Sequence, residues 1–120
     1  MTRDIFGNLR DWGPVLDQLT ELRSKRILDN HQEGLVRILR YRDNWRLRET
    51  ALEYARDLAT PSDDLLRQIL AIVVDHDTYY EMRIMAVQTL AILCSRMMRG
   101  HRTDQVAAKG ILSKLAALLE

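Results

Sequence analysis

Cysteine, proline and glycine are scarce in this chain, and each shortage excludes a kind of protein. Among its 120 residues there are one cysteine, two prolines and five glycines. A single cysteine cannot close an internal disulfide, which excludes a disulfide-stabilised secreted scaffold and favours a reducing compartment. Cys94 lies in an apolar stretch, so it is predicted to be a small core residue and not a reactive thiol. We therefore expect a cytoplasmic protein.

Long apolar runs and an excess of charge of either sign are also missing. No uninterrupted apolar run reaches the ~18 residues that a membrane span requires, so we expect no membrane partner. The formal net charge of +1 provides no overall attraction to nucleic acid or to an anionic membrane. With 47% hydrophobic residues, a chain of this length can bury one core, and residues 1–120 are predicted to form a single domain.

What the chain does contain is apolar residues at helical spacing, and the scarcity of proline and glycine leaves room for long helices. The stretch over 80–98 is apolar nearly all round, which predicts a central helix that is buried among neighbours or lies against a partner. Asn30 with Glu33 resembles a capping box for the second helix, and Ser62 or Asp63 is placed to cap the fourth. The predicted helices run over about 14–28, 31–42, 45–59, 63–75, 80–98 and 103–119.

The chain overlays itself when it is shifted by 35 residues, so that Leu35 meets Leu70. The apolar positions of two helix–turn–helix units then coincide. The matched pairs include Ile38 with Val73, Leu47 with Met82, Ala51 with Ala86 and Leu58 with Leu93. Self-similarity at this period indicates a solenoid, in which each helical hairpin buries its apolar face on the next.

The two units, LVRILRYRDNWRLRETALEYARDLA and LLRQILAIVVDHDTYYEMRIMAVQTLAIL, resemble HEAT and HEAT-like repeats. As in that family, each has an apolar first helix, an aspartate near the turn and a second helix that begins R-x-x-A, at Arg48 and at Arg83. The resemblance covers about residues 31–95 and implies an all-α fold, a short right-handed α-α superhelix of five or six helices. It implies an N-terminal capping helix in 1–30, repeats in 31–60 and 61–98, and a C-terminal capping helix in 99–120.

In the HEAT family an acid and the arginine commonly form a ladder along the stacked turns. The resemblance therefore implies that Asp43 and Asp77 pair with Arg48 and Arg83 in this chain. The two units differ in register, because Asp43 lies five residues before Arg48 whereas Asp77 lies six residues before Arg83.

Catalytic HEAT-like families leave no clear signature here. Hydroxylases of this class use repeated His-Glu pairs, whereas His31, His76 and His101 lie in separate turns and none precedes a glutamate. No His, Cys and carboxylate cluster has metal-ligand spacing, and there is no Gly-rich phosphate loop or nucleophile elbow. We expect no enzymatic activity, metal or cofactor. A HEAT-like lyase or DNA glycosylase is the catalytic alternative, the latter because Trp45 stands among arginines.

One candidate binding surface is basic. Arginines crowd into 37–48, and Tyr41 and Trp45 stand among them. Arginines with aromatic residues can hold phosphates and stack bases, so nucleic-acid binding through the Arg37–Arg48 patch is the alternative function. Arginines of helical repeats also lie in ladders and on solvated faces. The candidate contacts of this patch are Arg40, Arg42, Trp45 and Arg46.

The other candidate surface is an apolar strip on the long helix over 80–98. When the chain is shifted by 35 residues, the positions of this strip coincide with a charged face of the helix over 45–59. We expect that charged face to be solvated. The strip Ile84, Gln88, Ala91 and Ile92 corresponds to Glu49, Glu53, Arg56 and Asp57. Either the C-terminal helix covers this strip, or a partner helix or a second copy of the chain does, and Met97 and Met98 at its end fit both readings.

Taken together, these patterns favour a non-catalytic scaffold or adaptor for protein–protein interaction. We expect a protein partner or a homodimer, with nucleic acid as the alternative.

Overall fold

Six α-helices follow one another in the computed structural model, which describes residues 5–118. Within this part of the chain there is one short 3₁₀ helix and no strand, so the all-α prediction is confirmed. The elements are α1 (Trp12–Ser24), η1 (Leu28–His31), α2 (Gln32–Arg40), α3 (Trp45–Ala55), α4 (Asp63–Val74), α5 (Tyr80–Met97) and α6 (Arg102–Leu118).

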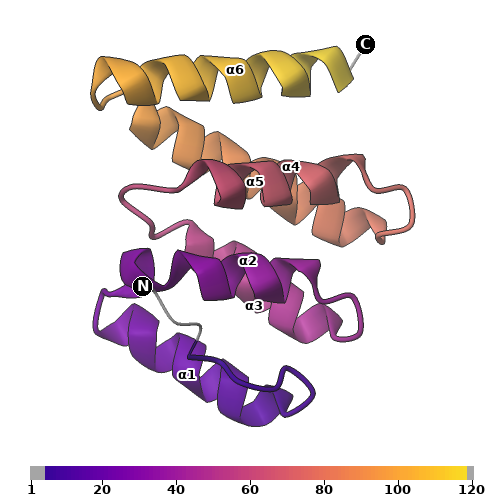
Figure 1. The fold of residues 1–120 in the computed structure, drawn as a ribbon. Coiled ribbons are helices and arrows are strands. Elements are labelled where there is room, and N and C mark those ends of the chain that lie inside the picture. The colour runs from indigo at the N-terminus through magenta and orange to yellow at the C-terminus, as the bar shows by residue number, and fades with distance from the viewer. Residues whose placement is uncertain (1–4, 119–120) are drawn as a thin grey trace.

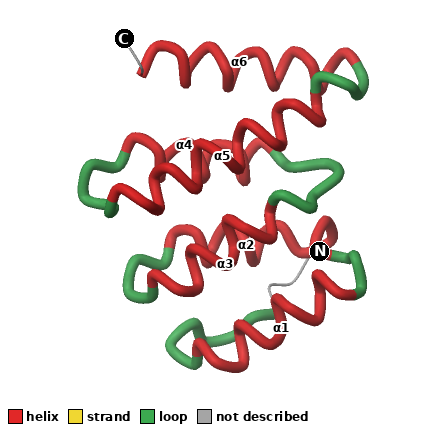
Figure 2. The backbone as a smooth tube through the Cα atoms, turned by 180° about the vertical axis from the view of Figure 1, so that it is seen from behind, coloured by secondary structure: helices red, strands yellow, loops and turns green. Residues whose placement is uncertain are grey.

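The helices form two hairpins that lie one upon the other (Figure 1). In the first hairpin α2 packs against α3, and in the second α4 packs against α5. Between the hairpins α2 contacts α4 and α3 contacts α5. At one end α1 packs on α3, and at the other α6 packs on α5 and α4. Figure 2 shows that the loops within the hairpins gather on one side of the stack and the loops between the hairpins on the other.

The core runs continuously through the stack because each helix turns one apolar face toward its neighbours. Leu19 of α1 and the central apolar residues of the two hairpins are fully buried. Those of the hairpins include Leu35, Ile38, Leu39, Leu47, Leu52, Leu65, Ile69, Met82 and Leu90. Cys94 also lies in this core, and burial raises the pKa of its thiol. The expected role of Cys94 as a buried apolar residue is therefore confirmed.

The helix α1 ends at Ser24, four residues before the predicted end. A C-terminal cap ends it there, and this cap contains no glycine that would mark it in the sequence. The N–H of Ile27 donates to the carbonyl of Leu22 at 3.1 Å, and the N–H of Arg26 donates to that of Arg23 at 3.0 Å. These are the two hydrogen bonds of a Schellman cap, in which the residue corresponding to Arg26 adopts a left-handed conformation and is usually glycine. Arg26 does adopt it, with φ of 59°. An arginine at this position does not mark a helix end in the sequence.

The helix starts agree with the predicted caps at one place and differ at another. The Ser62 side chain accepts a hydrogen bond from the N–H of Leu65 at 3.2 Å, so Ser62 caps α4 as predicted. The capping box at Asn30 and Glu33 was wrong. Asn30 lies within η1, which runs directly into α2, and its own N–H donates to the carbonyl of Ile27.

Candidate functional site

The arginines of the predicted basic patch are largely occupied within the protein. Arg40 Nε donates to Gln68 Oε1 of the next hairpin at 2.9 Å. Arg42 forms an ion pair with Asp75 across the two hairpin turns. Arg48 is buried and donates to a main-chain carbonyl. Within the patch, Arg40 and Arg42 therefore join the two hairpins while lying at the surface, and Arg48 stabilises its own hairpin.

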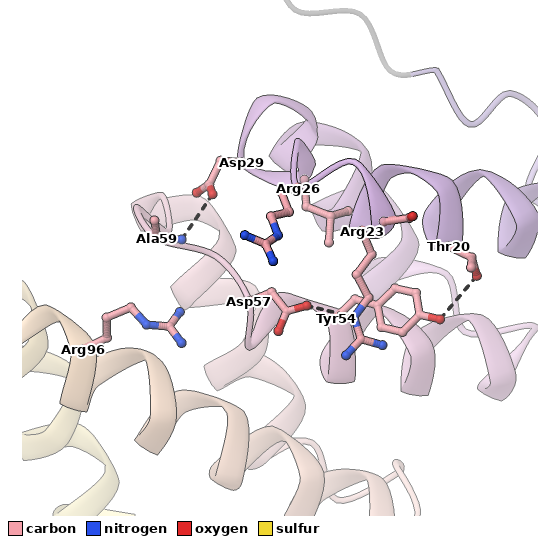
Figure 3. A pocket seen from close by; sticks show the side chains of 10 residues that line it. Thr20, Arg23, Arg26, Asp29, Tyr54, Asp57, Ala59 and Arg96 are labelled. Carbon is pink, nitrogen blue, oxygen red and sulfur yellow. Dashed lines mark hydrogen bonds and ion pairs between the residues drawn. The ribbon is translucent and has the colours of Figure 1, made fainter.

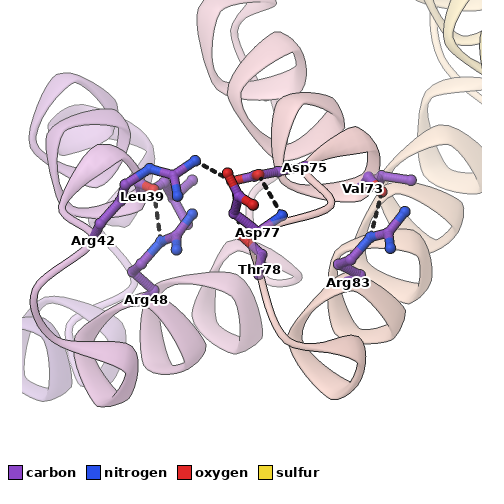
Figure 4. A network of polar contacts seen from close by, with 8 residues as sticks. All are labelled: Leu39, Arg42, Arg48, Val73, Asp75, Asp77, Thr78 and Arg83. Atoms are coloured by element: carbon purple, nitrogen blue, oxygen red, sulfur yellow. Dashed lines mark hydrogen bonds and ion pairs between the residues drawn. The ribbon is translucent and has the colours of Figure 1, made fainter.

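The predicted ladder of Asp43 and Asp77 with Arg48 and Arg83 takes a different form (Figure 4). Arg48 Nε donates to the carbonyl oxygen of Leu39 at 3.0 Å, and Arg83 Nε donates to that of Val73 at 2.9 Å. Both carbonyls belong to the last turn of the preceding helix, where the final four carbonyls lack helical partners. In each hairpin the arginine of R-x-x-A thus caps the C-terminus of the first helix.

The carboxylate that connects the hairpins is that of Asp75, in the second turn (Figure 4). It accepts the N–H of Asp77 at 3.0 Å and the hydroxyl of Thr78 at 2.9 Å, and it pairs with Arg42 of the first hairpin. These contacts, the Asp77 N–H first, lower the pKa of Asp75. Asp77 contributes its backbone to this turn, and the acid of the inter-hairpin pair is Asp75 where the resemblance implied Asp77.

The apolar strip of α5 remains partly exposed although α6 packs on α5. Ile84 is 37% exposed and Ile92 38%, and Val87 on the same side of the helix is 40% exposed. Ala91 and Gln88 are also exposed. Of the two alternatives for this strip, full coverage by the C-terminal helix is therefore wrong. The inward-facing side of α6, around Ala108 and Ile111, packs on the stack and leaves the strip accessible.

Met97 and Met98, which follow the strip in the sequence, point into the core and not toward the exposed side of α5. Met97 is buried, and Met98 is half-buried and packs against the core. Both side chains fill space within the stack, so they are not available as surface contacts for a partner.

The charged face of α3 that corresponds to this strip is solvated only in part, because Glu53 and Asp57 are exposed as expected whereas Glu49 and Arg56 are half-buried. Glu49 accepts a hydrogen bond from the Tyr79 hydroxyl at the start of α5. Arg56 Nε donates to Thr89 Oγ1 of α5 at 3.1 Å. Because Glu49 and Arg56 of α3 contact α5 and the turn before it, the equivalent positions of α5 are those that a further helix would contact.

A groove of about 500 Å³ borders the exposed strip near the start of α5. Its walls are mainly aliphatic and aromatic, with polar groups at the edges. It is lined by Val73, Val74, His76, Tyr80, Arg83, Ile84, Val87 and Gln88. Tyr80 is 70% exposed, so an apolar surface from both α4 and α5 faces solvent here.

A second hollow, of about 690 Å³, lies between α1, α3 and α5, and most of the residues that line it are polar (Figure 3). Arg23 Nε pairs with Asp57 at 2.8 Å, and its guanidinium lies 4.5 Å from the ring centre of Tyr54. Asp29 accepts the N–H of Ala59 at 3.2 Å. Arg96 donates to the carbonyl of Leu58. These groups satisfy one another, so the hollow is explained by contacts that hold α1 and α5 to α3.

A third feature is a cluster of Trp12, Trp45 and Arg46 on the surface. The guanidinium carbon of Arg46 lies 5.5 Å from the ring centre of Trp12 and 5.5 Å from that of Trp45. Trp12 begins α1 and Trp45 begins α3, so only the packing of these helices brings the two rings together. No local spacing in the sequence indicates this cluster.

Within residues 5–118 no three His, Cys, Asp or Glu side chains lie close enough together to hold a metal ion. No described helix is both long and apolar enough to cross a membrane. The chain matches no family model, no curated protein and no solved structure with which it was compared.

Proposed function

We propose that the chain is a non-catalytic scaffold for protein–protein interaction, a short HEAT-like solenoid whose exposed α5 face binds an amphipathic helix of a partner protein. The observation that carries this proposal is the uncovered apolar strip of α5, with Ile84, Val87 and Ile92 each exposed by more than a third. Contiguous exposed apolar surface of this kind is typical of a helix-binding site.

The contact of α3 with α5 supports a helix as the occupant. On α3, Glu49 and Arg56 form hydrogen bonds with Tyr79 and Thr89, at the start and in the middle of α5. One repeat further along the chain, 35 residues on, the same positions hold Ile84 and Ala91. The geometry that accommodates α5 on α3 would therefore place a partner helix on α5.

The chemistry of the strip specifies what that helix must present. Glu49 and Arg56 of α3 form hydrogen bonds toward α5, whereas the equivalent positions of α5 hold the aliphatic side chains of Ile84 and Ala91. The partner helix should therefore present a more apolar face to α5 than α5 presents to α3. Arg83 and Gln88 line the groove, so Arg83 can donate hydrogen bonds to polar residues flanking the apolar stripe, and the Gln88 amide can donate or accept them. The internal contacts of Arg40, Arg42 and Arg48 make nucleic acid the weaker alternative.

The proposal is tested with Ile84→Glu and a matched control, Val106→Glu. Val106 of α6 is 64% exposed and lies outside the groove, so the control adds the same charge to another apolar surface position. The probe is a fluorescein-labelled synthetic amphipathic helix with a leucine and alanine stripe, followed by anisotropy. We expect the wild type and Val106→Glu to bind it, and Ile84→Glu to bind at least about tenfold more weakly with the melting temperature changed by only a few degrees.

Four results would contradict the proposal. If Ile84→Glu costs several kcal/mol of stability, the strip belongs to the core. If both variants lose binding equally, the probe attaches non-specifically. A wild-type dimer in analytical ultracentrifugation that Ile84→Glu dissociates would make a second copy of the chain the occupant. Salt-sensitive binding of a single-stranded oligonucleotide without helix binding would favour the nucleic-acid alternative.

A further inference from the structure

The two tryptophans of the chain flank Arg46 on the surface at the start of α1 and α3, in a hollow that shares no lining residue with the groove beside α5. They line a shallow hollow of about 510 Å³ together with Asp43, Asn44 and Arg46. Trp12 is 43% exposed and Trp45 is 55% exposed. The core is complete without these rings, because α1 buries Val15, Leu19 and Leu22, and α3 buries Leu47, Ala51 and Leu52. Exposed tryptophan beside arginine is the composition that dominates binding energy at protein interfaces.

Arg46 differs from the other arginines near it in what it contacts. Arg42 and Arg48 each donate to an oxygen atom of the protein. The guanidinium of Arg46 contacts two indole faces and has no oxygen acceptor among the described residues. Cation–π contacts hold the planar group in place but leave its N–H edge free, and that edge matches the two oxygens of a carboxylate. Arg46 is thus positioned to receive an anion along this edge.

The turn before α3, with Asp43 and Asn44, adds further polar groups beside Arg46 and limits the kind of ligand that fits. The Asn44 Oδ1 accepts the N–H of Arg46 at 3.0 Å and that of Leu47 at 3.2 Å. This contact turns the amide oxygen toward the helix and leaves the amide N–H₂ as a donor. Asp43 brings a negative charge to the same hollow. One cation beside one anion suits a peptide with N–H and carboxylate groups better than a chain of phosphates.

We propose that Trp12, Trp45 and Arg46 form a second binding site, which recognises a peptide segment of a partner protein with an acidic residue next to a leucine or proline. The carboxylate lies along the N–H edge of Arg46, and the apolar side chain lies against the exposed indole faces. The Asn44 amide donates to a peptide carbonyl, and Asp43 accepts a peptide N–H. This site is independent of the α5 strip and does not require the function proposed above.

Intrinsic fluorescence tests the site directly, because Trp12 and Trp45 are the two tryptophans of the chain and all indole emission arises there. The probes are a capped eight-residue peptide alternating glutamate with leucine and proline, the same peptide with glutamine for glutamate, and an oligothymidylate. The variants are Arg46→Gln and Arg46→Lys, with Arg67→Gln on the exposed surface of α4 as the matched control. Circular dichroism verifies that each variant retains its helix content.

We expect the glutamate peptide to shift the emission saturably in the wild type and in Arg67→Gln. The affinity should fall about tenfold or more with the glutamine peptide and with Arg46→Gln, and also with Arg46→Lys, since lysine keeps the charge but lacks the planar fork. Ile84→Glu should leave it unchanged, which separates this site from the α5 strip. The proposal is overturned if folded wild type shows no change with the glutamate peptide at millimolar concentration, if the glutamine peptide binds equally, or if only the oligothymidylate binds.

Discussion

Arg56 and Thr89 form a hydrogen bond of 3.1 Å that joins the second helices of the two hairpins. Thr89 is fully buried, and its hydroxyl in turn donates to the carbonyl oxygen of Leu52 at 3.0 Å. Leu52 lies in the last turn of α3, where helix carbonyls have no partner of their own. Side chains from a following helix thus complete the end of an earlier one, as Arg48 and Arg83 do within each hairpin.

Replacing Thr89 with valine should destabilise the protein by about 1–3 kcal/mol, because the isosteric side chain leaves a buried carbonyl and the Arg56 donor without their partner. The measurement is urea unfolding followed by circular dichroism. The half-buried Thr50 provides the control, and Thr50→Val should change the free energy of unfolding by no more than about 0.5 kcal/mol. If the two substitutions lower the free energy of unfolding equally, the hydrogen bonds of the Thr89 hydroxyl do not stabilise the protein.

Arg48→Met and Arg83→Met remove the same contact from the two hairpins but should differ in cost. Arg48 is 7% exposed, so its loss leaves the Leu39 carbonyl without a donor in a dry site, at about 2 kcal/mol. Arg83 is half-buried, and water can replace it at the Val73 carbonyl, so the cost should be smaller. Chemical unfolding of both variants measures the difference. A larger loss for Arg83→Met would contradict this explanation.

The stability that Asp75 contributes should depend on pH. Its folded pKa lies below that of the unfolded chain, because the Asp77 N–H, the Thr78 hydroxyl and Arg42 favour the carboxylate. The contribution is therefore present above the unfolded pKa of about 3.9 and is lost as the pH falls through the folded pKa. The melting temperatures of wild type and Asp75→Asn should differ steadily at pH ~5–7 and converge below about pH 4.

Asp17→Asn, at an exposed position of α1, is the control for that comparison and should follow the wild-type curve. A gap between wild type and Asp75→Asn that stays constant down to about pH 2 would show that the charge of Asp75 is not what stabilises the turn.

Arg26→Gly should stabilise the protein by about 0.5–1 kcal/mol, an unusual outcome for removal of a large side chain. Arg26 holds a left-handed φ of 59°, which costs energy for any residue with a Cβ and little for glycine. Lys25 precedes it with a right-handed φ of −81°, so Lys25→Gly gains no such relief and should be destabilising. Thermal unfolding ranks the two variants, and the reverse order would refute the strain argument.

Much of the fold could be predicted from the sequence because a helix is a local structure. Apolar residues three and four positions apart lie on one face, so the core positions Leu47, Ala51 and Met82 could be recognised from spacing alone. The arginines at 48 and 83 stood out for the same reason, since they recur at the start of two similar helices. The end of α1 was not recognised, because Arg26 occupies a position where glycine is the usual signal.

Whether a predicted binding surface is exposed depends on which helices pack against each other, and the tertiary structure decides this. The sequence alone determined that the chain is helical, the approximate position of each helix and that the α5 face is apolar. Only the packing showed that α6 leaves Ile84 exposed, that Asp75 and not Asp77 reaches Arg42, and that Trp12 and Trp45 flank the same arginine. Contacts between residues some thirty positions apart follow from how hairpins stack, and no pattern within one helix encodes that arrangement.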